Sequence, residues 1–140
     1  MIIILAVDDK GGMLFNNRRQ SQDRELRKRI LEITNNKSLW MNQYSAKQFS
    51  TEDTPKLKID DDFLIKTGAG EYCFVENDSV LPYLNKIEKI VLFKWNRRYP
   101  SDFYFAIDLA DGNWVLESTN EFQGSSHEKI TEEIYNHEIN

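Results

Sequence analysis

Residues 72–93 read as a buried strand, a tight turn, a short helix and a second buried strand. Parallel neighbouring strands need a crossover of this kind, so the segment predicts an α/β sheet. In nucleotide-binding proteins the turn after the first strand brings backbone N–H groups against a phosphate, and glycines permit that approach. Here the turn is Glu76-Asn77-Asp78-Ser79, which has no glycine and carries two carboxylates. The segment therefore predicts the scaffold of a cofactor site without the groups that hold a phosphate.

The composition narrows the class of protein. The chain has 140 residues, of which 40% are hydrophobic and 29% are charged, and its mean hydropathy is -0.61. This predicts one soluble domain, residues 1–140. The longest apolar run, Ile2–Val7, is too short to span a bilayer and lacks the flanks of a signal peptide. The one cysteine, Cys73, cannot form an internal disulfide and is expected to be a core thiol, so a cytoplasmic location is the default.

The charge is distributed unevenly along the chain. The net charge is -5, but residues 18–29 hold six basic and two acidic residues, a local charge of +4. The rest of the chain therefore carries -9. An acidic body disfavours binding to nucleic acid and would suit a basic protein partner.

The apolar run Ile2–Val7 shows no polar alternation, which predicts a central strand covered on both faces. Further strands are expected at residues 38–42, 72–75, 90–95, 103–107 and 114–118, and short helices at residues 44–49, 62–67 and 80–86. Residues 50–61 are expected to form a surface connection. This order of elements predicts a mostly parallel, twisted sheet with an antiparallel edge.

A longer helix is expected at residues 23–34, where apolar residues recur at helical spacing and Asp23 or Ser21 can cap the first turn. The tail at residues 125–135 leaves two interpretations open. Ser125 and Glu128 match a capping box, which favours a helix. The alternation of Ile130 with later apolar residues favours an edge strand instead.

In the order and spacing of these segments, the chain resembles dihydrofolate reductase over nearly its whole length. Residues 3–17 are similar to that family's first strand and active-site loop, residues 25–34 to its first helix, and residues 39–42 to its second strand. Residues 81–92 resemble the helix and strand after the family's cofactor turn, and residues 102–108 match its closing strands. The resemblance implies a shortened dihydrofolate reductase-like fold of the α/β class.

The departures from this family concern its NADPH site. The Gly-Gly pair of the cofactor turn is replaced by residues 76–77 or 77–78, and the second NADPH element, Gly-Arg-basic-Thr, by Asn42-Gln43-Tyr44-Ser45. The segment that would hold a third strand and contact adenine is reduced to residues 50–61. The family's acid in the first helix falls at Leu26, or at Glu25 if one residue is deleted. The resemblance therefore implies that NADPH is not bound in the family's manner, and no cofactor is expected.

The candidate functional residues gather in two places. A polar loop and helix face, beside the segment after the second strand, is the candidate surface for a protein partner or small anionic ligand. Its members are Arg18, Arg19, Gln20, Ser21, Asp23, Arg24, Arg27, Asn42 and Ser45. Glu25 is a weak candidate for a proton relay, in a pocket bounded by Ala6, Met13, Glu25, Ile30 and Trp40. With two histidines and one cysteine, no zinc site is expected.

Three hypotheses about function follow. The first is a non-catalytic dihydrofolate reductase-like protein that binds a protein partner or small ligand without NADPH, and therefore not an enzyme. The second is a reductase or nucleotide-linked enzyme that uses the retained cleft. The third is an immunity or inhibitor protein whose acidic body neutralises a basic toxin. No nucleic acid and no membrane is expected among the partners.

Overall fold

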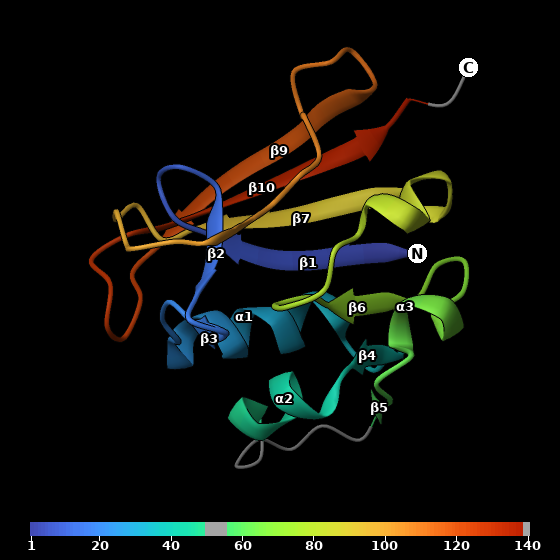
Figure 1. The fold of residues 1–140 in the computed structure, drawn as a ribbon, viewed down its shortest axis with the longest axis horizontal. Helices are drawn as coiled ribbons and strands as arrows, with labels where there is room; N and C mark the ends of the chain where they lie inside the picture. The colour runs from blue at the N-terminus through green and yellow to red at the C-terminus, as the bar shows by residue number, and fades with distance from the viewer. Residues whose placement is uncertain (50–55, 139–140) are drawn as a thin grey trace.

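A seven-stranded sheet with β1 (Ile2–Val7) at its centre organises the computed structural model, which describes residues 1–49 and 56–138 (Figure 1). The strand order is β5-β4-β6-β1-β7-β10-β9. The five strands from β5 to β7 are parallel, whereas β10 runs antiparallel to both β7 and β9. The predicted sheet, mostly parallel with an antiparallel edge, is confirmed.

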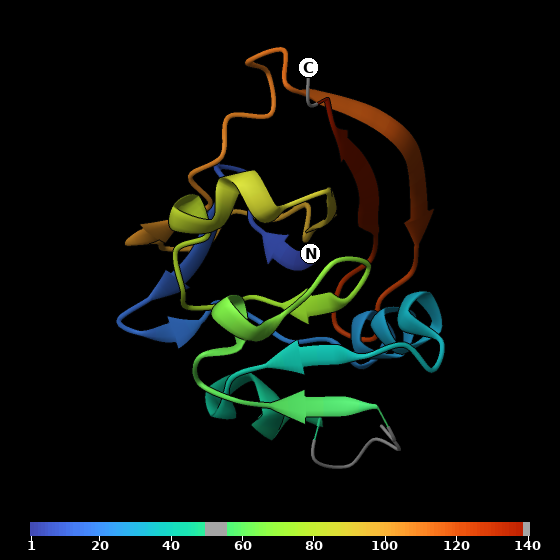
Figure 2. The ribbon, with the colours of Figure 1, turned by 90° about the vertical axis from the view of Figure 1, so that its right-hand side faces the viewer.

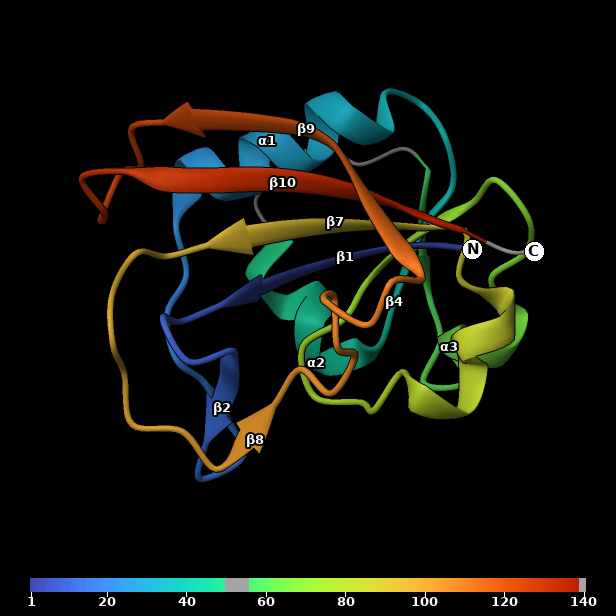
Figure 3. The ribbon, with the colours of Figure 1, turned by 90° about the horizontal axis from the view of Figure 1, so that it is seen from above.

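The other strands of this sheet follow the apolar segments of the chain. They are β4 (Leu39–Met41), β5 (Leu57–Ile59), β6 (Tyr72–Phe74), β7 (Lys89–Lys94), β9 (Trp114–Phe122) and β10 (Ile130–His137). A separate antiparallel sheet of three short strands lies beyond the carboxyl end of β1 (Figure 3). It consists of β2 (Gly12–Phe15), β3 (Arg18–Arg19) and β8 (Phe103–Tyr104).

The helices are short except for one. They are α1 (Arg24–Thr34), α2 (Gln43–Ala46), α3 (Phe63–Lys66) and the 3-10 helices η1 (Lys47–Phe49) and η2 (Leu81–Lys86). No helix in the part of the chain that the structure describes is long and apolar enough to cross a membrane.

Both faces of the central strand are covered, as its unbroken apolar sequence predicts. Ile2 and Ile4 face α1 and η1, in a core that contains Leu26 and Ile30 of α1. The alternate residues of β1 face α3 and η2, in a second core that contains Phe63. Figure 2 shows these two layers on either side of the sheet. The crossovers from β1 and from β6 therefore pass over opposite faces.

The structure corrects three details of the predicted elements. The tail is a strand and not a helix, and it is not an edge, because β10 lies between β7 and β9. The strand expected at residues 103–107 is limited to Phe103–Tyr104 and belongs to the small sheet. The surface connection at residues 50–61 contains β5, which forms the other edge; residues 50–55 lie outside the described part of the chain.

Ile130, at the start of β10, is fully buried in the core beneath α1. We expect Ile130→Ala to lower the free energy of unfolding by about 2–5 kcal/mol, because the truncation leaves a cavity. Val115→Ala is the matched control on β9, where the side chain is 46% exposed, and should cost less than about 0.5 kcal/mol. Urea unfolding followed by tryptophan fluorescence measures both. Equal small losses would contradict the packing of β10 into this core.

Candidate functional site

The candidate site is the crevice at the carboxyl ends of β1 and β6. These strands are neighbours, and the connections that leave them pass over opposite faces of the sheet. Open α/β sheets bind their ligands at such a switch point. On the α1 side, the crevice contains a cavity lined by apolar side chains of β1, β6 and α1 and by a polar set from three other segments. The polar residues are Arg19, Gln20, Ser21, Gln48 and Glu76.

Side chains fill most of this crevice. The cavity on the α1 side leaves about 20 Å³ for the centre of a water molecule, which is the space of about one or two waters. On the η2 side, a second cavity leaves about 10 Å³. Met13 and Val75 line both cavities. In this closed form the crevice has room for water but not for a dinucleotide.

An ion pair between Arg19 and Glu76 closes the crevice. Arg19 Nε donates to Glu76 Oε2 at 2.9 Å and Arg19 Nη2 donates to Glu76 Oε1 at 3.1 Å, a bidentate arrangement. The guanidinium lies over the ring of Tyr44, 4.4 Å from its centroid, and also donates to the Tyr44 carbonyl. The Tyr44 hydroxyl accepts from the Arg19 backbone N–H at 2.7 Å. The side chains are 21% and 9% exposed, so the pair is largely shielded from solvent.

The rest of the turn after β6 is held by Asn42. Its Nδ2 donates to Asn77 Oδ1 at 2.7 Å and to Asp78 Oδ2 at 3.2 Å, and its Oδ1 accepts from the Ser45 backbone N–H. Burial raises the pKa of Asp78 above its ordinary value. The two segments that the resemblance identifies with phosphate binding are therefore bonded to each other.

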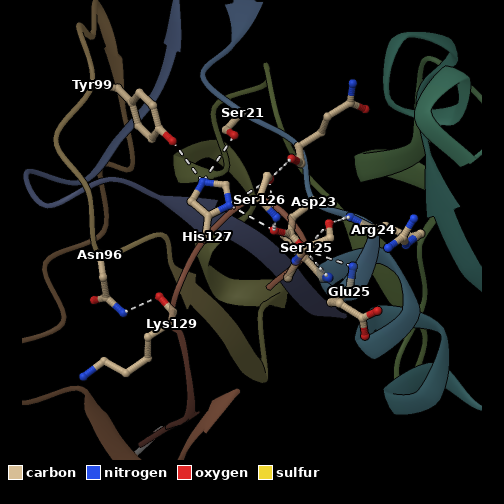
Figure 4. Close-up of polar contacts among 12 residues, drawn as sticks. Ser21, Asp23, Arg24, Glu25, Asn96, Tyr99, Ser125, Ser126, His127 and Lys129 are labelled. Carbon is tan, nitrogen blue, oxygen red and sulfur yellow. Dashed lines mark hydrogen bonds and ion pairs between the residues drawn. The ribbon is translucent and has the colours of Figure 1, made fainter. Parts of the chain in front are cut away.

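A buried polar network joins the start of α1 to the loop between β9 and β10 (Figure 4). Asp23 caps α1 by accepting from the backbone N–H groups of Glu25 and Leu26. The same carboxylate accepts from the backbone and hydroxyl groups of both Ser125 and Ser126. A Cβ on Gly124 would lie 2.5 Å from Asp23 Oδ2, so this approach of the loop requires glycine.

His127 completes the network. Its Nδ1 lies 3.0 Å from Asp23 Oδ2, and both side chains are almost wholly buried. Burial alone would raise the pKa of Asp23, but the hydrogen bonds from Ser125, His127, Ser126 and Leu26 lower it well below its ordinary range. Because an ionised carboxylate only accepts, Nδ1 of His127 carries the hydrogen.

Asp23, His127 and Ser21 contact one another in the sequence acid, histidine, serine that a nucleophilic triad has. Other contacts of His127 favour a structural role. Nε2 of His127 lies 2.9 Å from the Tyr99 hydroxyl and 3.3 Å from the Ser21 hydroxyl, so Tyr99 makes the shorter contact. The imidazole is stacked on Trp95, 4.4 Å between ring centroids. A base that accepts its best hydrogen bond from tyrosine is poorly placed to activate the serine.

The structure separates the predicted surface into three parts. Arg19, Gln20 and Ser21 line the cavity, whereas Asp23, Asn42 and Ser45 are buried in the networks that hold its walls. Arg18 and Arg24 are exposed, and Arg27 is half-buried on α1. No sequence motif marks Gln48, Tyr99 or His127 as site residues, because each meets its neighbours only in the folded chain.

The pocket predicted around Glu25 is not formed as expected. Ala6 and Met13 line the cavity, but Ile30 is fully buried beneath the sheet and Trp40 packs in the core on the opposite face. Leu26, and not Glu25, is the helix residue at the cavity. Burial raises the pKa of Cys73 to about 12, so this thiol is not a nucleophile. Within residues 1–49 and 56–138, no group of three side chains could hold a metal ion.

The strand order, the crossovers and the crevice define a dihydrofolate reductase-like fold. The chain is similar to the solved dihydrofolate reductase from Enterococcus faecalis, in a complex with NADP(H) and RAB-propyl, with a TM-score of 0.68 and 10% sequence identity. The match covers 99% of this chain and 97% of that one. No family model and no protein of curated function matches the sequence.

We expect Asp23→Asn to lower the free energy of unfolding by about 2 kcal/mol or more, because the hydrogen bonds lost are to a buried charge. Asparagine caps helices as well as aspartate does, so the loss reports the loop and not the cap. Asp9→Asn is the control, since Asp9 is exposed and its carboxylate has no partner among the described residues. Chemical denaturation measures both variants. A loss of only a few tenths of a kcal/mol in Asp23→Asn would show that Asp23 stabilises the fold as a helix cap alone, a role that asparagine keeps.

The lowered pKa of Asp23 also predicts how stability changes with pH. In the unfolded chain this carboxyl titrates near pH 4. Its stabilising effect is therefore complete above about pH 5 and is lost as the pH falls through 4 toward the folded pKa. Between pH 5 and pH 3, we expect the stability gap between the natural chain and Asp23→Asn to shrink by about 1 kcal/mol. Urea midpoints measured at both pH values check this, and a constant gap would contradict it.

Proposed function

We propose that the chain is a non-catalytic, dihydrofolate reductase-like protein that binds a small ligand in the crevice and does not bind NADPH in the family's manner. The observation that carries this proposal is the bidentate pair between Arg19 and Glu76. The pair lies at the turn after β6, where the resemblance places the family's cofactor turn. A dinucleotide bound there would have to displace it.

Charge supports the same conclusion. The solved Enterococcus faecalis enzyme holds NADP(H), and a pyrophosphate binds where backbone N–H groups converge on it. In this chain Glu76 and Asp78 place carboxylates at the corresponding turn. The side-chain N–H groups of Asn42 already donate to Asn77 and Asp78 of that turn, so they are not available to a phosphate. The only cation in contact with the turn, among the described residues, is Arg19, and Glu76 already neutralises it.

Loss of the cofactor removes hydride transfer, and the helix residue at the cavity is Leu26 in place of an acid. The fold keeps an apolar cavity with a few polar groups, which is the usual form of a small-molecule site. The single cysteine is consistent with action in the cytoplasm. Binding, and not reduction, is the activity that these residues support best.

Titration with NADPH tests the proposal. We expect no binding at NADPH concentrations up to about 1 mM, measured by calorimetry and by nucleotide fluorescence, because the ion pair and the carboxylates oppose the phosphates. A dihydrofolate reductase titrated in parallel serves as the positive control. A dissociation constant in the micromolar range or below would overturn the proposal.

A further inference from the structure

A groove outside the crevice opens between the carboxyl ends of β1 and β7 and the connection from β8 to β9. Its volume is about 420 Å³, a size that suits a small organic molecule. None of the described residues lines both this groove and the cavity that Arg19 and Glu76 close, and none of its described lining residues lies on β6 or α1. The groove, which we call the β7 groove, is therefore separate from the switch point of the sheet.

The floor of the β7 groove is apolar. Val7 and Leu92 come from the two strands, and both are buried. The facing wall belongs to the connection from β8 to β9, and its apolar members are Phe105, Ile107 and Leu109. The Gly11 carbonyl accepts from the Phe105 backbone N–H at 2.9 Å, which fixes this wall against the turn after β1. Phe105 and Leu109 are only half-buried, so they keep apolar surface that a ligand can cover.

The free charges of the β7 groove are negative. Its one cation among the described lining residues, Lys94, is paired with Glu133 at 3.0 Å. The carboxylate of Asp8 is buried, and both of its oxygens accept hydrogen bonds from the surrounding loops. Asp9 is exposed and its carboxylate has no partner in the described part of the chain. Asp108 is exposed and accepts from one backbone N–H of its own turn. Two carboxylates on opposite sides of the groove are thus left without a cation.

We propose that the β7 groove binds a small organic cation, an ammonium group carried on an apolar body. The body covers the apolar floor, and the ammonium group is attracted by Asp9, by Asp108 and by the ring of Phe105. A bare metal ion does not fit, because no three metal-ligating side chains come together within residues 1–49 and 56–138. An anion is excluded by the same two carboxylates. The inference does not rest on the proposed function, since the groove lies outside the crevice.

The test uses three probes of similar size that differ in charge, namely 2-phenylethylammonium, 2-phenylethanol and phenylacetate. Titration is followed by the backbone amide signals of Gly11 and Leu109 in ¹H–¹⁵N NMR spectra at neutral pH. We expect 2-phenylethylammonium to bind in the millimolar range, as suits so small a molecule. The neutral alcohol should bind about fivefold more weakly, and phenylacetate should cause no shift. Added salt should weaken binding of the cation and leave that of the alcohol unchanged.

Variants with altered charge complete the test. Asp9→Asn combined with Asp108→Asn should reduce binding of the cation to that of the alcohol. Asp111→Asn is the matched control, because Asp111 also accepts from a backbone N–H of its own turn but does not line the groove, and it should bind as the natural chain does. Lys94→Met should bind the cation several-fold more tightly. It removes the cation of the groove and frees Glu133, which lies opposite Leu92 in the sheet.

Three results would overturn the proposal. Equal binding of the cation and the alcohol would show an apolar groove without charge recognition. Unchanged binding in the chain that carries both Asp9→Asn and Asp108→Asn would show that the cation lies elsewhere. The absence of any shift at about 20 mM 2-phenylethylammonium, in the natural chain and in Lys94→Met, would show that the groove binds only water. None of these results bears on the NADPH titration, because that experiment concerns the turn after β6.

Discussion

The carboxylate of Asp23 is the interaction on which the rest of the site depends. It begins α1, and it accepts hydrogen bonds from a loop a hundred residues further along the chain, at Ser125 and Ser126. The first contact orients the helix beneath β1, and the second fixes the connection between β9 and β10. Because the group is buried and stays ionised, none of these partners can leave without exposing an unpaired charge to an apolar interior. One buried charge therefore holds in place the start of α1, the helix that contributes Leu26 to the wall of the cavity.

A second carboxylate, at Asp8, organises the opposite side in the same way. It follows β1 and accepts from the backbone N–H groups of Lys10 and Gly12 and from Tyr99. Hydrogen bonds to its charged form lower the pKa of Asp8, against the effect of burial. Gly12 is needed there, since a Cβ would lie 2.0 Å from the Ser101 hydroxyl oxygen. The loops that cover the crevice are thus held by hydrogen bonds to two carboxylates, besides the packing of Met13 and Tyr99 against the two cores.

How far the sequence predicts this structure depends on the range of the interaction involved. The central strand, α1 and the crossover were predictable because their apolar residues follow the local period of a strand or a helix. The tail was ambiguous because Ser125 and Glu128 imitate a helix cap; in the fold Ser125 instead donates to the cap of another helix, at Asp23. His127 gave no signal for the same reason, since its partners come from α1 and from residue 99. Local periodicity thus predicts elements, while the polar networks that build the site require the tertiary structure.

The carboxylate at the turn after β6 and the closure of the crevice are physically one feature. A carboxylate at position 76, nine-tenths buried, needs a cation, because an isolated charge at that depth is too costly. The cation comes from β3, and the Arg19 side chain must cross the crevice to reach it, guided by the ring of Tyr44. With this pair formed, the turn after β6 carries carboxylates and the cation that faces it is already neutralised. The closed crevice keeps a small cavity, beside which the side-chain oxygen of Gln20 and the side-chain nitrogen of Gln48 have no hydrogen-bond partner among the described residues.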